Sequence, residues 1–463
     1  MPTIDTGDTA WVLASAALVM FMTPGLALFY GGLVRSKNVL GTVMESFIAL
    51  GVVAVVWFVA GYGIAFGRDV GLVIGAPAGL AFGGAGADPV AFAPTIPGSA
   101  FAAFQMMFAV ITPALIAGAF AERMRFGAYV MFIALWSLLV YSPIAHWVWG
   151  GGFLGANGIG ALDFAGGTVV HISAGAAALA AVLFIGRRTG YPRRASIPHN
   201  VPLVLLGAGI LWFGWFGFNA GSALGANALA ASAFVTTHLG AAGALIGWLT
   251  VERIRHGKAT TVGAATGAVA GLVAITPAAG FVEPLPALLI GMAAGVVCFF
   301  AVGLKGRLGY DDSLDVVGVH LVGGVTGALL TGVFATLAVN PAGADGSLAQ
   351  VGRQAIAVGV TFGFSFVATL AILKLVDLVM RIRVTPEEEE EGLDVSEHGE
   401  VAYTFRERSP RRGRIPAEMT EGELQVLREE LVLEAAARVM AEVRAGDLIE
   451  ADAKPVRRVY RQA

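Results

Sequence analysis

Charged side chains are scarce in this chain. Only 14% of its 463 residues are Asp, Glu, Lys or Arg, whereas 56% are hydrophobic, and the mean hydropathy is +0.75. An ordinary soluble domain carries charge on about a quarter of its residues. This composition excludes a soluble globular enzyme, a disordered chain and a nucleic-acid binder as descriptions of the whole chain.

Cysteine and N-terminal basic residues are equally scarce. Cys298 is the only cysteine, which excludes an intrachain disulfide and a cysteine-based metal cluster. Residues 1–9 contain no Lys or Arg, so we expect no cleavable signal peptide and a first apolar run that is retained. The aqueous regions contain no nucleophile–base set and no phosphate-binding glycine loop. We therefore expect neither an enzyme nor a cofactor.

The few charges are unevenly distributed along the chain. Residues 1–383 contain 32 charged residues, whereas the much shorter stretch 384–463 contains 31. This contrast predicts a lipid-embedded body at 1–383, followed by an aqueous tail.

Long apolar segments fill the body. A helix needs roughly 20 mostly apolar residues to cross about 30 Å of hydrocarbon. Eleven candidate segments lie near residues 10–33, 41–66, 99–120, 127–149, 164–186, 201–221, 226–251, 260–276, 284–304, 316–338 and 352–383. Segment 70–98, rich in Gly, Pro and Ala, is predicted to be a long loop. The predicted fold class is an all-α polytopic membrane protein with eleven transmembrane helices.

Basic residues indicate which loops face the cytoplasm, because Lys and Arg favour that side of a cell membrane. Fifteen of them follow the odd-numbered segments, while the intervening loops contain only Arg68 and Arg353. This alternation predicts an N-terminus outside the membrane and a C-terminus in the cytoplasm.

Two stretches in the two halves of the body resemble each other. Asp163 precedes His171 by eight residues, and Asp312 precedes His320 by eight. The first stretch enters the membrane from outside and the second from inside, so segments 1–5 and 6–10 are predicted to form inverted repeats, with the eleventh as an addition. Transport sites in such repeats lie near the membrane midplane.

The two histidines of these matching stretches, His171 and His320, are the strongest candidates for functional residues. Eight helical residues rise about 12 Å, so an aspartate at each mouth puts His171 and His320 near the middle of the membrane. A histidine at that depth is a functional hypothesis by default. Two facing imidazoles can share a proton and still offer a donor or acceptor to a small polar solute. Lone histidines such as His146 and His238 more simply bond backbone carbonyls.

Aromatic side chains and a hydroxyl gather near the outer mouth. Aromatic faces attract small cations by about 0.5–2 kcal/mol. For any single ring, an interfacial belt or core packing is the simpler explanation, but the whole group favours a cation-recruiting vestibule. The members are Phe104, Phe108, Trp149, Trp215, Phe218 and Ser222. Asp163, at the same level, either attracts a cation or caps the fifth segment by bonding backbone amides.

These motifs resemble those of the ammonium transporter family, the Amt branch of the Amt/Rh superfamily. The resemblance covers about residues 8–403 and jointly its motifs are highly specific. The matching runs are Asp163–His171 with Ile172 and Gly175, Gly318-Val-His320, Phe104-Gln105 with Phe108, Trp149-Gly-Gly-Gly, Phe216-Gly-Phe218-Asn219-Ala-Gly-Ser222, Pro24-Gly25, Tyr30-Gly31-Gly32 and Arg35-Ser-Lys-Asn38. The family implies an eleven-helix homotrimer with one pore in each subunit.

The resemblance also implies a role for each candidate residue. It implies that three side chains form an outer ammonium site, with an aspartate that supports it: Phe104, Trp149 and Ser222, supported by Asp163. A gate and the pore below it are implied for five others: Phe108, Phe218, Trp215, His171 and His320.

The tail divides at Tyr403. Residues 384–403 resemble the family's cytoplasmic regulatory segment, which couples the subunits and responds to PII-type signal proteins. The matching residues are Gly392, Asp394, His398, Gly399, Glu400 and Tyr403. The acidic run 387–391 is predicted to be a solvated linker. Residues 404–463 form a charged extension outside the family pattern, and a capping box followed by spaced apolar residues predicts an amphipathic helix over 420–445.

These patterns predict a transporter of ammonium, with methylammonium as an analogue. NH₄⁺ is recruited at the outer aromatic site, loses its proton there or below, and passes the histidines as NH₃, with or without a separately moving proton. Two alternatives remain open: an ammonium sensor that signals through its tail, and an Rh-type neutral gas channel, which Trp149 disfavours. The expected partners are the lipid bilayer, further copies of the chain and, as a candidate, a PII-type protein at the cytoplasmic face.

Overall fold

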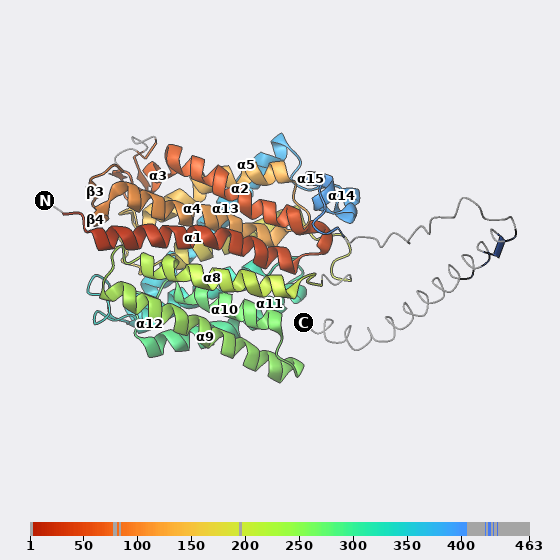
Figure 1. Ribbon diagram of the computed structural model, residues 1–463. Coiled ribbons are helices and arrows are strands. Elements are labelled where there is room, and N and C mark those ends of the chain that lie inside the picture. Colours follow the sequence, from red (N-terminus) through yellow and green to blue (C-terminus); the bar gives the residue numbers. More distant parts are fainter. Residues whose placement is uncertain are drawn as a thin grey trace. The chain divides into compact units, whose positions relative to one another are not determined.

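The computed structural model describes residues 3–76, 81–82, 85–193 and 197–404, together with residues 422, 425, 426, 429 and 433. The chain divides into two compact units, residues 1–402 and residues 403–463. The first unit is mostly helical (Figure 1).

Within the described residues, the α-helices of the first unit are interrupted by several π-helical turns. The α-helices are α1 (Thr6–Leu33), α2 (Val39–Val56), α3 (Tyr62–Phe66), α4 (Gly98–Phe120), α5 (Phe126–Trp136), α6 (Ser142–Val148), α7 (Ser173–Ile185), α8 (Val201–Gly221), α9 (Ala228–His256), α10 (Thr261–Ile275), α11 (Pro284–Leu308), α12 (Val322–Phe334), α13 (Leu348–Val379), α14 (Pro386–Glu391) and α15 (Leu393–His398). The π-helical turns are η2 (Trp57–Gly61), η3 (Ser137–Tyr141), η4 (Gly167–Ile172) and η5 (Val317–Leu321), and η1 (Ser36–Asn38) is a 3₁₀ turn.

Most of the predicted apolar segments form long helices. Among the described residues, ten helical segments are long and apolar enough to cross a membrane. The remaining predicted segment, 260–276, forms α10, which is apolar but has only 15 residues. That length rises about 22 Å, less than a hydrocarbon core of about 30 Å. The helix ends just before Pro277, which lacks the amide that would continue it.

The segment predicted as a loop at 70–98 contains two small antiparallel sheets. Strand β1 (Asp69–Val70) pairs with β2 (Ile74–Gly75), and β3 (Pro89–Val90) pairs with β4 (Ala93–Pro97). The first turn is tightened by the Leu72 amide, which donates to the Asp69 carboxylate at 3.0 Å. We call the end of the helical unit that carries these strands the hairpin end (Figure 1).

Helices α14 and α15 lie at the opposite end, which we call the tail end (Figure 1). The prediction of a solvated linker at 387–391 is wrong, because these residues belong to α14, and Glu388 and Glu389 contact the rest of the first unit. Glu389 is only 1% exposed; it accepts a hydrogen bond from the Thr189 amide and pairs with Arg383 at 2.9 Å. Glu388 pairs with Arg125 at 2.8 Å. The acidic run folds because it faces basic groups.

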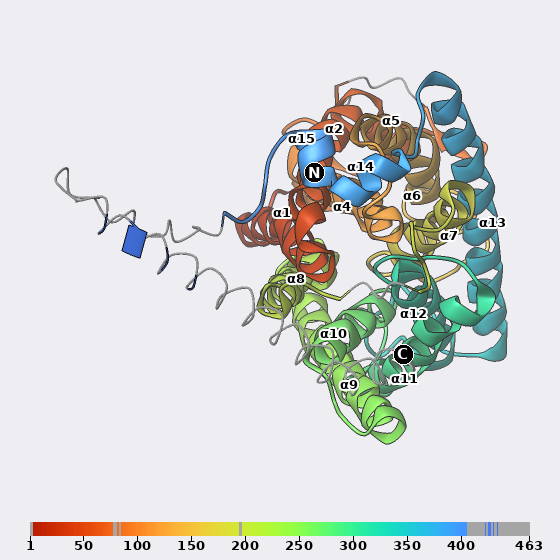
Figure 2. The same ribbon diagram turned by 90° about the vertical axis from the view of Figure 1, so that its right-hand side faces the viewer.

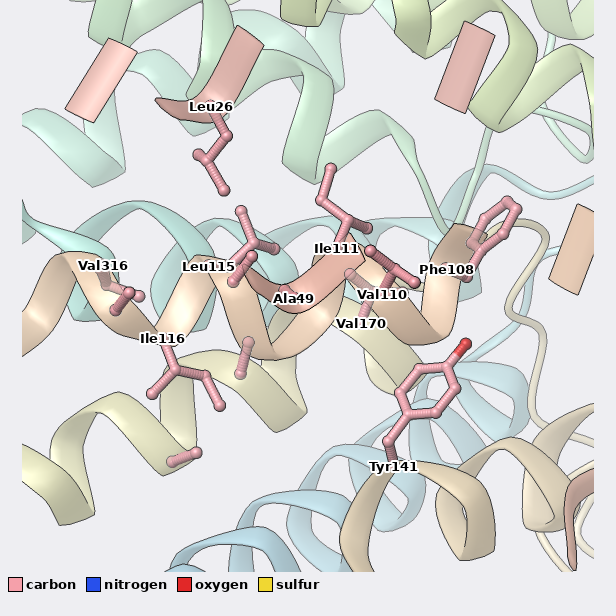
Figure 3. Packing of buried hydrophobic residues seen from close by; sticks show 14 of the residues in the cluster. Leu26, Ala49, Phe108, Val110, Ile111, Leu115, Ile116, Tyr141, Val170 and Val316 are labelled. Atoms are coloured by element: carbon pink, nitrogen blue, oxygen red, sulfur yellow. The ribbon is translucent and has the colours of Figure 1, made fainter. Parts of the chain in front are cut away.

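Small residues let the helices pack closely, as is typical of membrane proteins. Helices α1 and α8 lie side by side in both ribbon views (Figures 1 and 2), and a side chain added at Gly207 would collide with the backbone of Phe29. The interior between α1 and α4 is apolar: Leu26 and Leu115 point toward one another in Figure 3. These two side chains also line the cavity described below.

Little of the extension after residue 403 is described. Gly422, Gln425, Val426, Glu429 and Leu433 are helical and exposed. The rest of the amphipathic helix predicted over 420–445 lies outside the described residues.

Candidate functional site

A narrow cavity lies inside the first unit, between α1, α4, α8 and α10. Its polar lining comes from His171 and His320, and Trp215 and Phe218 supply aromatic faces. The rest of the lining is apolar and consists of Met22, Leu26, Phe29, Ile111, Leu115, Leu211 and Val269. Such a space suits a small neutral solute, because two histidines and two aromatic faces among apolar side chains replace only a small part of the hydration of an ion.

The two histidines face each other across this cavity. His171 lies in η4 and His320 in η5, and both side chains are buried. Their Nδ1 atoms are 3.2 Å apart and their rings are stacked, with centroids 5.3 Å apart. One of the two nitrogens must carry a proton that the other accepts. Nε2 of His171 is buried without a protein partner, so it is available to a solute in the cavity.

Wide π-helical turns carry both histidines. Such turns are rare and are frequent at functional sites. Each follows an aspartate whose carboxylate accepts backbone amides near the start of the turn: Asp163 for η4 and Asp312 for η5. The spacing seen in the sequence therefore corresponds to two similar local structures.

Aromatic rings continue from the histidines toward the hairpin end. Trp215 stacks on His171 at 5.5 Å, and its Nε1 donates to the Thr276 hydroxyl at 2.9 Å. Phe218 lies 5.3 Å from Trp215 and 6.1 Å from His171. The hydrogen bond to Thr276 holds the Trp215 ring in the plane that faces the histidine.

Two phenylalanines pack against each other at the side of the cavity that faces the hairpin end. The rings of Phe108 and Phe218 are 4.3 Å apart, and each side chain is 1% exposed. Phe104, one turn earlier on α4, meets Phe108 edge-on at 4.9 Å. Ring contact leaves no open passage between these two side chains.

Trp149 and Ser222 lie above this pair. The Trp149 ring meets Phe108 edge-on at 6.1 Å and is partly buried. The Ser222 hydroxyl donates to the carbonyl of Phe218 at 2.8 Å. With its hydrogen committed there, the Ser222 oxygen keeps lone pairs that can accept from an N–H donor.

Asp163 connects Trp149 to the π-helical turn that carries His171. Its backbone carbonyl accepts from Nε1 of Trp149 at 2.9 Å. Its buried carboxylate accepts from a set of donors at the start of η4: the amides of Gly166, Gly167, Thr168 and Val169 and the hydroxyl of Thr168. Burial raises the pKa of Asp163, although these donors oppose the shift. Both carboxylate oxygens are engaged, so Asp163 positions its neighbours.

A buried ionic network fixes the tail end of the unit. Arg188 pairs with Asp311 at 2.8 Å and with Glu122 at 3.1 Å, and Arg35 pairs with Glu122 at 3.0 Å. Burial opposes ionisation of Glu122 and Asp311, but the arginines keep both pKa values below the ordinary range. This network joins the loops that follow α1, α4, α7 and α11.

The predicted regulatory residues lie on the same end of the unit. The carboxylate of Asp394 accepts from the Gly41 amide at 2.9 Å, and the His398 ring meets Phe126 at 4.9 Å. Gly392 has φ 109° and packs on Lys37, where a side chain would collide. Gly399, with φ 67°, ends α15, and the Glu400 amide donates to the Asp394 carbonyl at 3.0 Å. Tyr403 is the first residue of the second unit.

Sequence reasoning missed the residues that support the site. Thr276 holds Trp215, and Thr168 adds a hydroxyl to the Asp163 cap. Neither residue stands out in an apolar sequence, because a helical Ser or Thr usually bonds its own backbone. His146, treated as structural, bonds the Ala65 carbonyl at 3.0 Å and Asp69 at 2.9 Å, away from the cavity.

Comparisons with known proteins identify the family. The model of the Ammonium Transporter Family matches residues 10–403. The ammonium transporter of Bacillus subtilis is 51% identical over 406 residues, covering 86% of this chain and 99% of that protein. The ammonium transporter of Mycobacterium tuberculosis is 50% identical over 434 residues, covering 87% and 91%.

Solved structures agree with this assignment. Mep2 of Candida albicans superposes with a TM-score of 0.77 at 37% identity, covering 83% of this chain and 88% of that chain. A structure titled "Sensor Amt Protein" gives a TM-score of 0.78 at 32% identity, covering 85% and 98%. This chain therefore belongs to the ammonium transporter family.

Proposed function

We propose that this chain recruits NH₄⁺ at an aromatic site near the hairpin end, removes its proton, and conducts NH₃ past the twin histidines. One observation carries the proposal: an unbroken series of ring contacts leads from Trp149 through Phe108 and Phe218 to His171 and His320. The series ends in a cavity that suits a neutral molecule, and it begins with rings and a hydroxyl that suit a cation.

Recruitment uses the outer residues. The face of Trp149 and the ring of Phe104 attract the ion, and the free lone pairs of Ser222 accept one of its N–H groups. Hydrogen-bond donation separates NH₄⁺ from K⁺, which has a similar size but no donor. Asp163 supports this site by holding Trp149 and η4 in place.

The proton is lost at or just below the outer site. Carrying a charge through the apolar cavity is costly, so the neutral molecule moves on when the Phe108–Phe218 gate opens. Inside, His171 and His320 supply the only polar side-chain atoms that line the described cavity, apart from the indole of Trp215. Hydrogen bonds to these nitrogens replace part of the water that NH₃ leaves behind.

The membrane arrangement follows from the same proposal. The hairpin end faces outward and the tail end faces the cytoplasm, as the distribution of basic loops indicates. The short helix α10 and the buried residues 276–282 after it complete an eleventh crossing, giving two inverted repeats and a final helix, α13. Three copies assemble, each with its own pore, and the docked residues 384–403 offer PII-type proteins a surface. Residues 1–383 then form the transport domain, and 404–463 an extension.

Replacing Trp149 with leucine is expected to raise the KM for methylammonium by about 2- to 30-fold. This is the factor that corresponds to losing a cation–π contact worth about 0.5–2 kcal/mol. The maximal rate changes less, because the gate and histidines remain. Uptake of radiolabelled methylammonium by cells measures both quantities. Trp248→Phe is the matched control, since Trp248 packs on Phe299 of α11 and touches none of the proposed site. An unchanged KM in Trp149→Leu would remove Trp149 from the site.

A sensor is the second candidate, favoured by the likeness to the structure titled "Sensor Amt Protein" and by residues 404–463, which lie beyond the family match. Ammonium flux into liposomes distinguishes a transporter from a sensor. A transporter moves ammonium at a similar rate before and after truncation at Tyr403, because the whole proposed pore precedes that residue. Binding without flux in both proteins would establish the sensor.

A further inference from the structure

The two aspartates that precede the histidines differ in one respect. Both carboxylate oxygens of Asp163 accept hydrogen bonds. In Asp312 one oxygen, Oδ2, accepts from the Val317 amide at 2.7 Å, but the other, Oδ1, has no partner. The side chain is only 1% exposed. A buried carboxylate oxygen without a hydrogen-bond donor is costly if the residue only caps a helix. Oδ1 of Asp312 can therefore still bind a proton or accept a hydrogen bond, because the cap uses only Oδ2.

Asp312 lies one layer beyond the cavity, toward the tail end. Leu115 of α4 lines the cavity, and its carbonyl accepts from the Tyr30 hydroxyl at 3.0 Å. One turn further along α4, the Gly118 carbonyl accepts from the Leu314 amide at 3.0 Å, which fixes the loop of Asp312. Tyr30 and the loop of Asp312 are therefore both anchored to α4, the helix that lines the cavity through Leu115.

Charged groups of both signs surround Asp312. Lys305 of α11 donates to the Asp312 carbonyl at 3.0 Å and to the carboxylate of Asp315. Burial raises the pKa of Asp312 to about 6; Lys305 opposes the shift and Asp315 adds to it. The titratable groups around it, from α1, α11, the loop after α4 and its own loop, are Tyr30, Lys305, Arg123, Tyr310, Asp311 and Asp315. A carboxyl in such surroundings changes charge near neutral pH.

We propose that Asp312 is the proton-exchange group at the tail end of the pore, where its free oxygen returns a proton to ammonia. The proposal rests on the function proposed above. The protonated carboxyl gives its proton to NH₃, yielding NH₄⁺ and a carboxylate, and the carboxylate takes a proton back from water at the tail end. The transfer is downhill, because ammonia is a much stronger base than a carboxylate. The Val317 amide and Lys305 stabilise the carboxylate between cycles.

Infrared spectroscopy of the full-length protein in liposomes tests this directly. We expect a protonated-carboxyl band that titrates near pH 6 and is missing in Asp312→Asn. The asparagine oxygen still accepts from Val317, so η5 keeps its cap. Asp345→Asn, at an exposed loop residue that bonds the Leu337 amide, is the control and keeps the band. A band near pH 6 that keeps its full amplitude in Asp312→Asn, or no such band in the native protein, overturns the proposal.

For two further variants we expect the midpoint pH of the infrared band to shift in opposite directions. Lys305→Gln removes the cation that lowers the pKa of Asp312, so the midpoint of the band moves up by about one pH unit. Asp315→Asn removes a like charge, so the midpoint moves down; asparagine also tolerates the positive φ of 64° at this position. Both variants leave the carboxyl of Asp312 in place, which keeps the test valid if Asp312→Asn folds poorly.

Flux separates this proposal from the proposed function. The pH dependence of ammonium flux, varied on the tail side, is expected to follow the infrared midpoint in the native protein, Lys305→Gln and Asp315→Asn, and to disappear in Asp312→Asn. Native protein without flux overturns the proposed function and this proposal with it. Native flux whose pH dependence is the same in all four proteins overturns proton exchange at Asp312 alone.

Discussion

Replacing His171 with alanine is expected to reduce ammonium flux by about 10- to 100-fold. The change removes the nitrogen that faces His320 at 3.2 Å and the free Nε2 that faces the cavity. In the proposed pathway NH₃ then loses a hydrogen bond that replaces part of its hydration, and an unmade hydrogen bond in a buried site costs about 1–3 kcal/mol. In a barrier, 1.36 kcal/mol is a factor of ten in rate. Uptake of radiolabelled methylammonium measures the loss.

The control for this variant is His256→Ala. His256 ends α9, meets Phe299 at 5.6 Å and does not line the cavity. Its flux should equal that of the native protein. Undiminished uptake by folded His171→Ala would show that solute does not pass the histidine pair.

The second large effect is expected for Asp163→Ala, which should both destabilise the protein and abolish flux. The substitution strips the start of η4 of its acceptors and leaves several buried amides unsatisfied. Together these losses cost at least about 3 kcal/mol, which lowers the midpoint of thermal unfolding by roughly 5 °C or more. Flux falls because η4 carries His171 and because Asp163 fixes Trp149.

Asp345→Ala provides the comparison for stability. Asp345 also accepts an amide, that of Leu337, at 2.8 Å, but in an exposed loop where water can replace the carboxylate. Its unfolding temperature should change little. A similar unfolding temperature for Asp163→Ala and the native protein would mean that the Asp163 cap does not hold η4.

The membrane body could be predicted from sequence because its signals are strong and local. Runs of about 20 apolar residues predict membrane helices directly, and the helices found agree with the predicted segments to within several residues. The exception, α10, is short for a reason that a hydropathy pattern does not register: it stops before Pro277. The two sheets at 69–97 were missed because their strands are only two to five residues long.

The candidate site was foreseeable only in part. An aspartate eight residues before a histidine, repeated in both halves, indicated that the two histidines belong together, and their Nδ1 atoms lie 3.2 Å apart. The π-helical turns that carry them have no simple sequence pattern. Two other π-helical turns, η2 and η3, have no side-chain cap, so an aspartate ahead of the turn does not identify them either. Thr276, the partner of Trp215, lies 61 positions away along the chain and is brought to it by the fold, whereas Thr168 is close to Asp163 in sequence but looks like any helical threonine.

The tail shows the opposite kind of error. Five consecutive glutamates suggested a solvated linker, because like charges repel when they have no counterions nearby. The basic groups that pair with Glu388 and Glu389 are Arg125 and Arg383; Arg125 is more than 250 positions away along the chain. Only the fold brings it within reach of the acidic run.

Flux through purified protein tests the central claim most directly. Full-length protein is reconstituted in liposomes, an ammonium gradient is applied, and uptake is followed beside His171→Ala and protein-free liposomes. We predict saturable uptake by the native protein and about 10- to 100-fold less by His171→Ala. Saturable binding of ammonium without uptake by the native protein would contradict transport and favour a sensor.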